Sequence, residues 1–144
     1  MNNYGNNVFV VFDGYRNINC TKSAKRYCRS LKNASRDLIF DQNMHLKIRQ
    51  EKFLANINNK SRLIEMLRKK LAHNNIFSCQ AEGDADTLII QTAINIESEN
   101  VVVVAEDIDV LLLLTALIPP HREIYFLKPA KGTVSAKIYS NKSL

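Results

Sequence analysis

The sequence reads Cys79-Gln-Ala-Glu-Gly-Asp-Ala-Asp86 at one point and Val101-Val-Val-Val-Ala-Glu-Asp-Ile-Asp109 at another. In both stretches a short apolar run is followed by three carboxylates, and a second apolar run comes next. Crowded carboxylates repel one another, so a site that gathers several of them usually holds cations as well. The two stretches therefore predict a site for divalent metal ions, with carboxylate oxygens as the ligands.

Three apolar runs have the β-branched and aromatic composition of buried parallel strands, namely Val8–Asp13, Ile76–Cys79 and Val101–Ala105. The last of them is apolar on both faces, which predicts a central strand. Open α/β sheets build their sites at the carboxyl ends of their strands. The fold class predicted is therefore α/β, with the acids that follow the three strands at one edge of the sheet.

The pattern also predicts helices and two later strands. Basic helices are expected at Lys22–Arg36 and Leu38–Leu54, and Ser61 is expected to cap a helix that runs to Asn74 and Asn75. Asp84–Ile96 and Val110–Leu117 are expected to be helices, and Glu123–Leu127 and Thr133–Tyr139 strands. Asp86 is expected to act as the cap or dipole partner of its helix rather than as a ligand.

Composition limits the class of protein. The chain has 144 residues, of which 46% are hydrophobic, and this predicts one globular domain spanning residues 1–144. Its three cysteines show no CxxC spacing, which argues against a zinc knuckle or a disulfide framework. No apolar run has the length of a membrane span, and the first residues do not resemble a signal peptide. We expect an intracellular protein, in the nucleus or the cytoplasm, without a membrane partner.

Charge is segregated along the chain. Residues 14–75 carry fifteen Lys and Arg against four Asp and Glu, a net charge of +11. Residues 76–112 carry eight Asp and Glu and neither Lys nor Arg, a net charge of −8. A basic segment beside a metal-binding one is what phosphodiester hydrolysis requires, because the first attracts phosphates and the second positions the metal. The alternative is an ordinary solvated pair of basic helices.

Taken together, the motifs Val-Phe-Asp13-Gly, Ala-Glu82-Gly-Asp84-Ala-Asp and Ala-Glu-Asp107-Ile-Asp109, with a long basic insert after the first, resemble the flap-endonuclease-like branch of the PIN-domain nucleases. More narrowly, the chain is similar to PIN-like proteins of animal genomes that accompany transposable elements. The resemblance covers about residues 8–140. It implies a three-layer sandwich with a mostly parallel central sheet, and a helical, arch-like insert at 15–75 between the first and second strands.

By this resemblance, five carboxylates would bind up to two Mg2+ or Mn2+ ions, and basic residues of the insert would contact DNA or RNA. The metal ligands would be Asp13, Glu82, Asp84, Asp107 and Asp109, and the candidates for nucleic-acid binding are Arg16, Lys22, Lys25, Arg26 and Arg29. The family has a further strand with a metal-binding Asp upstream, and a Gly-x-Asp segment with DNA-gripping helices downstream. The chain is therefore expected to be the middle part of such a domain.

The sequence supports more than one function. The first is an endonuclease or 5′ nuclease that hydrolyses phosphodiesters with metal assistance. The second is a catalytically impaired module, derived from a mobile-element protein, that binds nucleic acid or another partner. A third interpretation treats Glu82-Gly-x-x-Asp86 with Asp107-x-Asp109 as Toprim-like, although the short gap between these motifs and the strand at 8–13 with its insert count against it.

Overall fold

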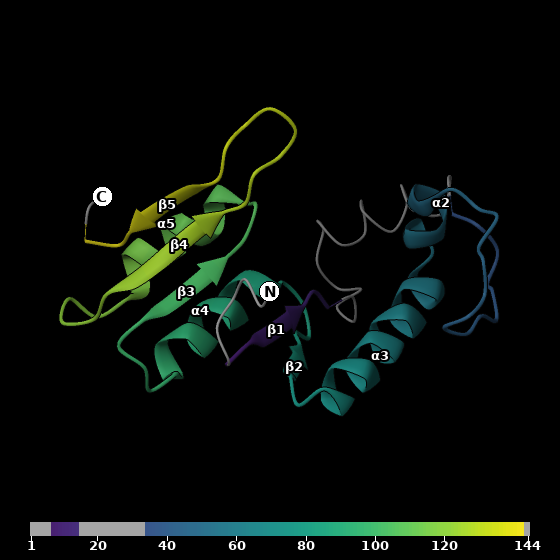
Figure 1. Cartoon of the computed structure of the whole chain (residues 1–144), viewed down its shortest axis with the longest axis horizontal. Coiled ribbons are helices and arrows are strands. Elements are labelled where there is room, and N and C mark those ends of the chain that lie inside the picture. The colour runs from purple at the N-terminus through teal and green to yellow at the C-terminus, as the bar shows by residue number, and fades with distance from the viewer. Residues whose placement is uncertain (1–6, 15–33, 143–144) are drawn as a thin grey trace. The chain divides into compact units, whose positions relative to one another are not determined.

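The chain is a mixed α/β protein that divides into two compact units, Met1–Gly83 and Asp84–Leu144. The computed structural model describes residues 7–14 and 34–142 (Figure 1). Within these residues the first unit has a sheet of two strands, and the second unit has a sheet of three. The predicted α/β class is confirmed, whereas the single domain and the single central sheet stay predictions.

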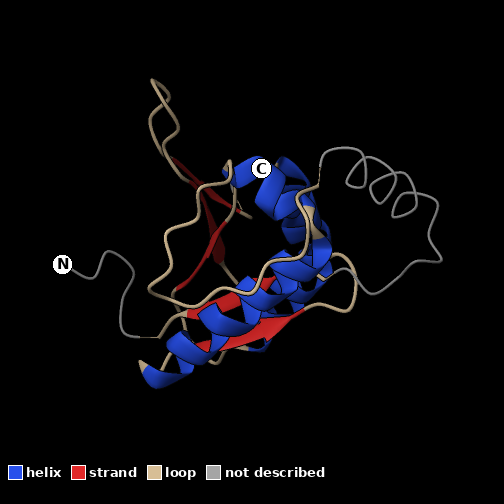
Figure 2. Cartoon of the chain, turned by 90° about the vertical axis from the view of Figure 1, so that its right-hand side faces the viewer, coloured by secondary structure: helices blue, strands red, loops and turns tan. Residues whose placement is uncertain are grey.

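Two parallel strands form the sheet of the first unit, β1 (Phe9–Phe12) and β2 (Phe77–Gln80). The pairing runs from Phe9 opposite Phe77 to Phe12 opposite Gln80. Parallel strands need a long crossover connection, and here it contains α2 (Gln50–Ala55) and α3 (Ile57–His73). Helix α3 packs against β2 (Figure 2). Both strands lie within one or two residues of their predicted positions.

The connection before α2 differs from the prediction. Residues 34–49 form neither an α-helix nor a strand, and helical structure starts only at Gln50, so the helix expected at Leu38–Leu54 is wrong for most of its length. Of the helix expected at Lys22–Arg36, only residues 34–36 are among those described, and they are not helical.

A buried asparagine explains why residues 35–38 do not continue a helix. Asn59 is only 1% exposed. Its side chain accepts a hydrogen bond from the backbone N–H of Leu38 at 2.8 Å, and it donates to Ser35 Oγ and to the carbonyl of Arg36. These bonds satisfy polar groups of a partly buried segment, together with the buried amide of Asn59 itself. The segment is thereby held against the start of α3.

Asn56 sets the start of α3. Its side-chain oxygen accepts from the backbone N–H of Asn59 at 3.0 Å, which is the geometry of an N-cap. The helix therefore begins at Ile57, and its N-cap lies five residues before the cap expected at Ser61. Asn56 also donates to Asp37, as does Asn58, and these two hydrogen bonds lower the pKa of the Asp37 carboxyl.

The second unit contains two helices and a three-stranded sheet, ordered β3-β4-β5. Its elements are α4 (Ala85–Asn95), β3 (Val101–Val104), α5 (Ile108–Leu117), β4 (Ile124–Lys128) and β5 (Lys137–Ser140). Strands β3 and β4 are parallel, and β4 and β5 are antiparallel. The elements agree with the predicted ones, except that the last strand begins at Lys137 rather than at Thr133.

Strand β3 is the first strand of this three-stranded sheet, in which it pairs with β4. Val101 and Val103 are buried, whereas Val102 is 52% exposed and Val104 is 43% exposed. The alternation follows from the period of two in a strand, since Val101 and Val103 belong to one buried cluster with residues of α4 and α5. A run of four valines gives no sign of this difference, because every position is equally apolar.

The core of the second unit lies between the two helices and one face of the sheet. Its most deeply buried side chains are Ile90, Val110, Leu114, Ile124 and Phe126. Arg122, just before β4, ties the end of α4 to this core by donating hydrogen bonds to the carbonyls of Ile94 and Ile96. No helix in the described ranges is long and apolar enough to cross a membrane.

Replacing Asn59 with alanine is expected to release residues 35–38 from α3. The change leaves the backbone N–H of Leu38 without its acceptor, which should lower the free energy of unfolding by about 1–3 kcal/mol. Urea unfolding measures this loss, and limited proteolysis should show faster cleavage within residues 34–49. Asn43→Ala is the control, because Asn43 is exposed and uses its backbone N–H, which alanine keeps, for its hydrogen bond to Asp41. Equal effects of the two substitutions would contradict this account.

Candidate functional site

Backbone hydrogen bonds join the carboxyl ends of β1 and β2 beyond the strands themselves. The N–H of Ala81 donates to the carbonyl of Phe12 at 2.9 Å, and the N–H of Gly14 donates to the carbonyl of Gly83 at 2.9 Å. Asp13 and Glu82 lie within this joined region. Both predicted ligands of the first unit therefore lie just beyond the carboxyl ends of one pair of parallel strands, where the sequence places them.

Gly14 permits this close approach. A Cβ atom at position 14 would lie 1.9 Å from the carbonyl oxygen of Ala81, a distance that no side chain can adopt. The side chain of Gln80 adds a further link, because its Nε2 donates to the backbone carbonyl of Asp13 at 3.3 Å. The backbone that carries Asp13 is thus held to the second strand from both sides of residue 13.

The predicted ligands of the second unit lie at the N-termini of two helices. Asp84 is the N-cap of α4 and accepts from the N–H of Asp86 at 3.3 Å. Asp107 is the N-cap of α5 and accepts from the N–H of Asp109 at 3.2 Å. The two Asp-x-Asp sequences therefore adopt the same capping arrangement. Each first Asp uses one carboxylate oxygen for the cap, and the cap itself does not engage the second oxygen.

This arrangement refines the assignment of two acids. Asp84, expected in the first turn, is the N-cap of α4. Asp86, expected to be the cap or the dipole partner of the helix, lies in the first turn, where a dipole partner is found. An N-cap needs a residue with extended backbone just before the helix, and Asp84 has that conformation. Likewise, α5 begins at Ile108 and not at Val110, so Asp109 lies within its first turn.

Glu106, directly before this cap, is paired with a lysine. Lys131 Nζ lies 2.6 Å from Glu106 Oε2. The hydrogen bond and the positive charge of Lys131, with a smaller contribution from the charge of Lys128, lower the pKa of the Glu106 carboxyl. Glu106, which is not among the five predicted ligands, therefore already has a cationic partner.

The five predicted ligands divide between the two units. Asp13 and Glu82 belong to the first unit, and Asp84, Asp107 and Asp109 belong to the second. Within residues 7–14 and 34–142, no three Asp, Glu, His or Cys side chains are gathered closely enough to hold a metal ion. Four of the five predicted ligands are exposed and Asp13 is half-buried, so their oxygens are open to solvent. Oxygen donors of this kind suit Mg2+ and Mn2+.

Lys60 is a charged neighbour of Asp13 that the sequence did not single out. It lies on α3 and is half-buried. Burial lowers the pKa of the Lys60 ammonium group, and the negative charge of Asp13 opposes this shift. Lys60 and Asp13 are 47 positions apart in the sequence. The segment has fifteen Lys and Arg residues, and its sequence does not indicate which of these residues lies near Asp13.

The basic residues proposed for nucleic-acid binding lie outside the described residues. These are Arg16, Lys22, Lys25, Arg26 and Arg29. Their assignment stays a prediction.

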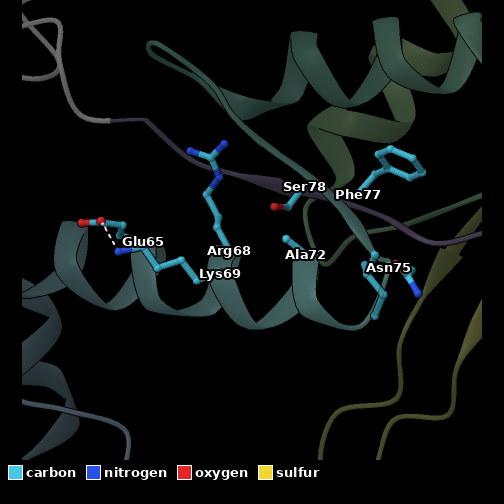
Figure 3. Close-up of a pocket in the computed structure, with 8 residues that line it drawn as sticks. Glu65, Arg68, Lys69, Ala72, Asn75, Phe77 and Ser78 are labelled. Carbon is cyan, nitrogen blue, oxygen red and sulfur yellow. Dashed lines mark ion pairs between the residues drawn. The ribbon is translucent and has the colours of Figure 1, made fainter.

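A pocket of about 610 Å³ lies between α3 and the beginning of β2 (Figure 3). Arg68 extends from the helix on the side that faces the strands, and Lys69 forms an ion pair with Glu65 at 2.8 Å. The pocket is lined by residues 75–78 at the amino end of β2, whereas Glu82 follows its carboxyl end. The pocket is therefore separate from the edge that carries the acids.

Comparisons with known proteins give no match to this chain, whether with protein-family models, curated proteins or solved structures.

Replacing Asp13 with asparagine is expected to lower the pKa of Lys60 further. The carboxylate of Asp13 raises this pKa against the effect of burial, so removing its charge leaves burial unopposed. A pH titration of labelled lysine side chains by NMR measures the shift. Asp41→Asn removes an exposed carboxylate elsewhere in the first unit and is the control, for which the pKa of Lys60 should not change. A rise in the pKa of Lys60 in Asp13→Asn would contradict the proximity of the two charges.

Proposed function

We propose that this chain is a metal-dependent nuclease-like domain that hydrolyses phosphodiesters of DNA or RNA, as a single-strand or structure-specific endonuclease or a 5′ nuclease. The observation that supports this proposal is the placement of acids directly after three strands. Asp13 and Glu82 follow the paired strands β1 and β2, and Asp107 follows β3. An arrangement with an acid at each strand end suits a metal site at a sheet edge.

The proposal includes a fold in which the two small sheets are parts of one mostly parallel sheet, the centre of a PIN-like three-layer sandwich. Among the described residues, β1 pairs only with β2 and β3 pairs only with β4, so each has one free edge. Free strand edges with exposed apolar side chains such as Val102 and Val104 are usually covered in a stable protein.

In this proposal the carboxylates act as metal ligands and not as acid or base. Asp13, Glu82, Asp84, Asp107 and Asp109 would hold up to two Mg2+ or Mn2+ ions. Bound ions of this kind polarise the phosphate, lower the pKa of a bound water and neutralise the leaving oxygen. The caps of α4 and α5 fix Asp84 and Asp107 in position, because the oxygen that accepts the backbone N–H orients the other.

A second candidate function is a nucleic-acid-binding or interaction module, derived from a mobile-element protein, that has lost catalysis. One observation favours it. Capping already accounts for Asp84 and Asp107, since aspartate is a preferred N-cap residue in helices that bind no metal. The acids of the second unit could therefore persist for helix stability alone.

Asparagine substitutions at the two acids of α5 separate ligation from capping. We expect Asp107→Asn together with Asp109→Asn to abolish Mn2+-dependent cleavage of a labelled 5′-flap or single-stranded substrate, with a loss of about 100-fold or more, because even residues that only orient metal ligands change activity by roughly 10–100-fold. Asparagine caps a helix as well as aspartate does, so the fold should be retained. Chelation of the metal should abolish cleavage by the unsubstituted chain.

Asp86→Asn is the matched control, because Asp86 has the same place in α4 that Asp109 has in α5 and is not a predicted ligand. It should cleave as the unsubstituted chain does. Cleavage that survives in the double variant would contradict the assignment of the ligands. Binding of the substrate without cleavage by any form would favour the binding module instead.

A further inference from the structure

The hairpin of β4 and β5 carries three lysines. Lys128 ends β4, Lys137 begins β5, and Lys131 lies in the connection between them, which extends beyond the strands (Figure 1). The end of this connection is a tight turn, since Lys131 and Val134 exchange backbone hydrogen bonds at 3.0 Å. Gly132 has a φ of 59°, which is the left-handed conformation that primed hairpin turns require. Lys131 is thereby held at a defined position.

The three lysines lie at the same edge of the sheet as the acids that follow β3. Strands β3 and β4 are parallel, with Val104 opposite Leu127, so their carboxyl ends coincide. The N–H of Ala105 continues this pairing by donating to the carbonyl of Leu127 at 3.2 Å. The 2.6 Å contact between Lys131 and Glu106 shows directly that the hairpin reaches the residues after β3.

Folding alone does not favour this placement of charge. Lys128 and Lys137 are direct cross-strand partners, and like charges at such positions destabilise a sheet. Lys131 has Glu106 as a partner, yet both side chains are exposed, at 77% and 64%, so their ion pair contributes little to stability. The second unit has five Lys and Arg residues in all, and three of them gather on this hairpin.

We propose that Lys128, Lys131 and Lys137 form a binding surface for the phosphodiester backbone of single-stranded nucleic acid. These three residues are the hairpin lysines. The inference rests on the proposed function, which places phosphates next to the acids after β3. Lysine side chains bind phosphate as flexible point charges and need no fixed bidentate geometry. Lys131 exchanges its contact with Glu106 for a phosphate oxygen when the strand binds.

The hairpin lysines give the substrate a second positive surface. The predicted surface lies in the insert at 15–75, which comes before the acids in the sequence. The hairpin comes after them, and its lysines follow the strand next to β3. Phosphates bound by the hairpin lysines would lie at the edge of the sheet where the acids after β3 are found.

Binding can be tested without cleavage. Fluorescence anisotropy with a labelled single-stranded oligonucleotide, in the presence of a chelator, measures affinity of the full chain at several salt concentrations. We expect replacement of all three hairpin lysines with alanine to weaken binding by about 10-fold or more at low salt. Each lost phosphate contact lowers the slope of log K against log salt by about 0.7, so the slope should fall by about 2.

Lys142→Ala is the matched control. Lys142 is an exposed lysine just after β5, at the opposite end of that strand, and it too lies near a carboxylate, Glu123 at 3.9 Å. Its removal should leave affinity within about twofold of the unsubstituted chain, since it contributes no phosphate contact. Replacement of the three hairpin lysines with arginine should preserve binding, and thermal unfolding followed by circular dichroism checks that every variant is folded.

The outcomes separate this inference from the proposed nuclease activity. Unchanged affinity in the triple alanine variant, an equal loss in Lys142→Ala, or no binding by the unsubstituted chain would each overturn the hairpin lysines as a binding surface. A folded chain that binds through these lysines but cleaves nothing with Mn2+ would contradict the nuclease and support the surface. Mn2+-dependent cleavage by the unsubstituted chain, with unchanged affinity in the triple alanine variant, would support the nuclease and contradict the hairpin lysines as a binding surface.

Discussion

Parallel pairing of short strands is the constraint on which the arrangement of the charged residues depends. In a parallel pair the carboxyl ends coincide, so the residues that follow both strands are brought to one edge regardless of their distance in sequence. Phe12 opposite Gln80 places Asp13 beside the segment that carries Glu82. Val104 opposite Leu127 places Glu106 beside the hairpin that carries Lys131. The same constraint acts in both units.

The acids at these strand ends have two physical uses that do not exclude each other. As N-caps, Asp84 and Asp107 each contribute about 1 kcal/mol to the helix they begin. As ligands they would use the oxygen that the cap leaves open. Helix α5 starts close to the edge of the sheet, because its N-cap, Asp107, comes three residues after the end of β3. One side chain can then serve both stability and metal binding, and the two uses separate in asparagine variants.

The strands, α4 and α5 could be predicted from sequence because each depends on neighbouring residues. A run of four valines and an Asp-x-Asp before an apolar stretch are local signals, and the structure agrees with them to within about two residues. The segment before α3 could not be predicted, because its conformation depends on Asn59, which bonds to Leu38 from 21 positions away. Burial of one asparagine overrides the weak helical pattern of that segment. The position of β3 in its sheet could not be predicted either, because the sequence of a strand does not identify the strands with which it pairs.

The arrangement of charges could be predicted only in part, because it too depends on contacts between residues far apart in the sequence. The fifteen Lys and Arg in residues 14–75 predict positive charge in the insert, and residues 76–112 contain acids but neither Lys nor Arg. In the folded second unit the acid next to the cap of α5 does have a cation, supplied by a turn 25 residues further on. Antiparallel return of β5 then brings Lys137 back to Lys128. An acidic segment that looks isolated along the chain is thus flanked by positive charge in space, and this balance lets anionic and cationic groups occupy one sheet edge.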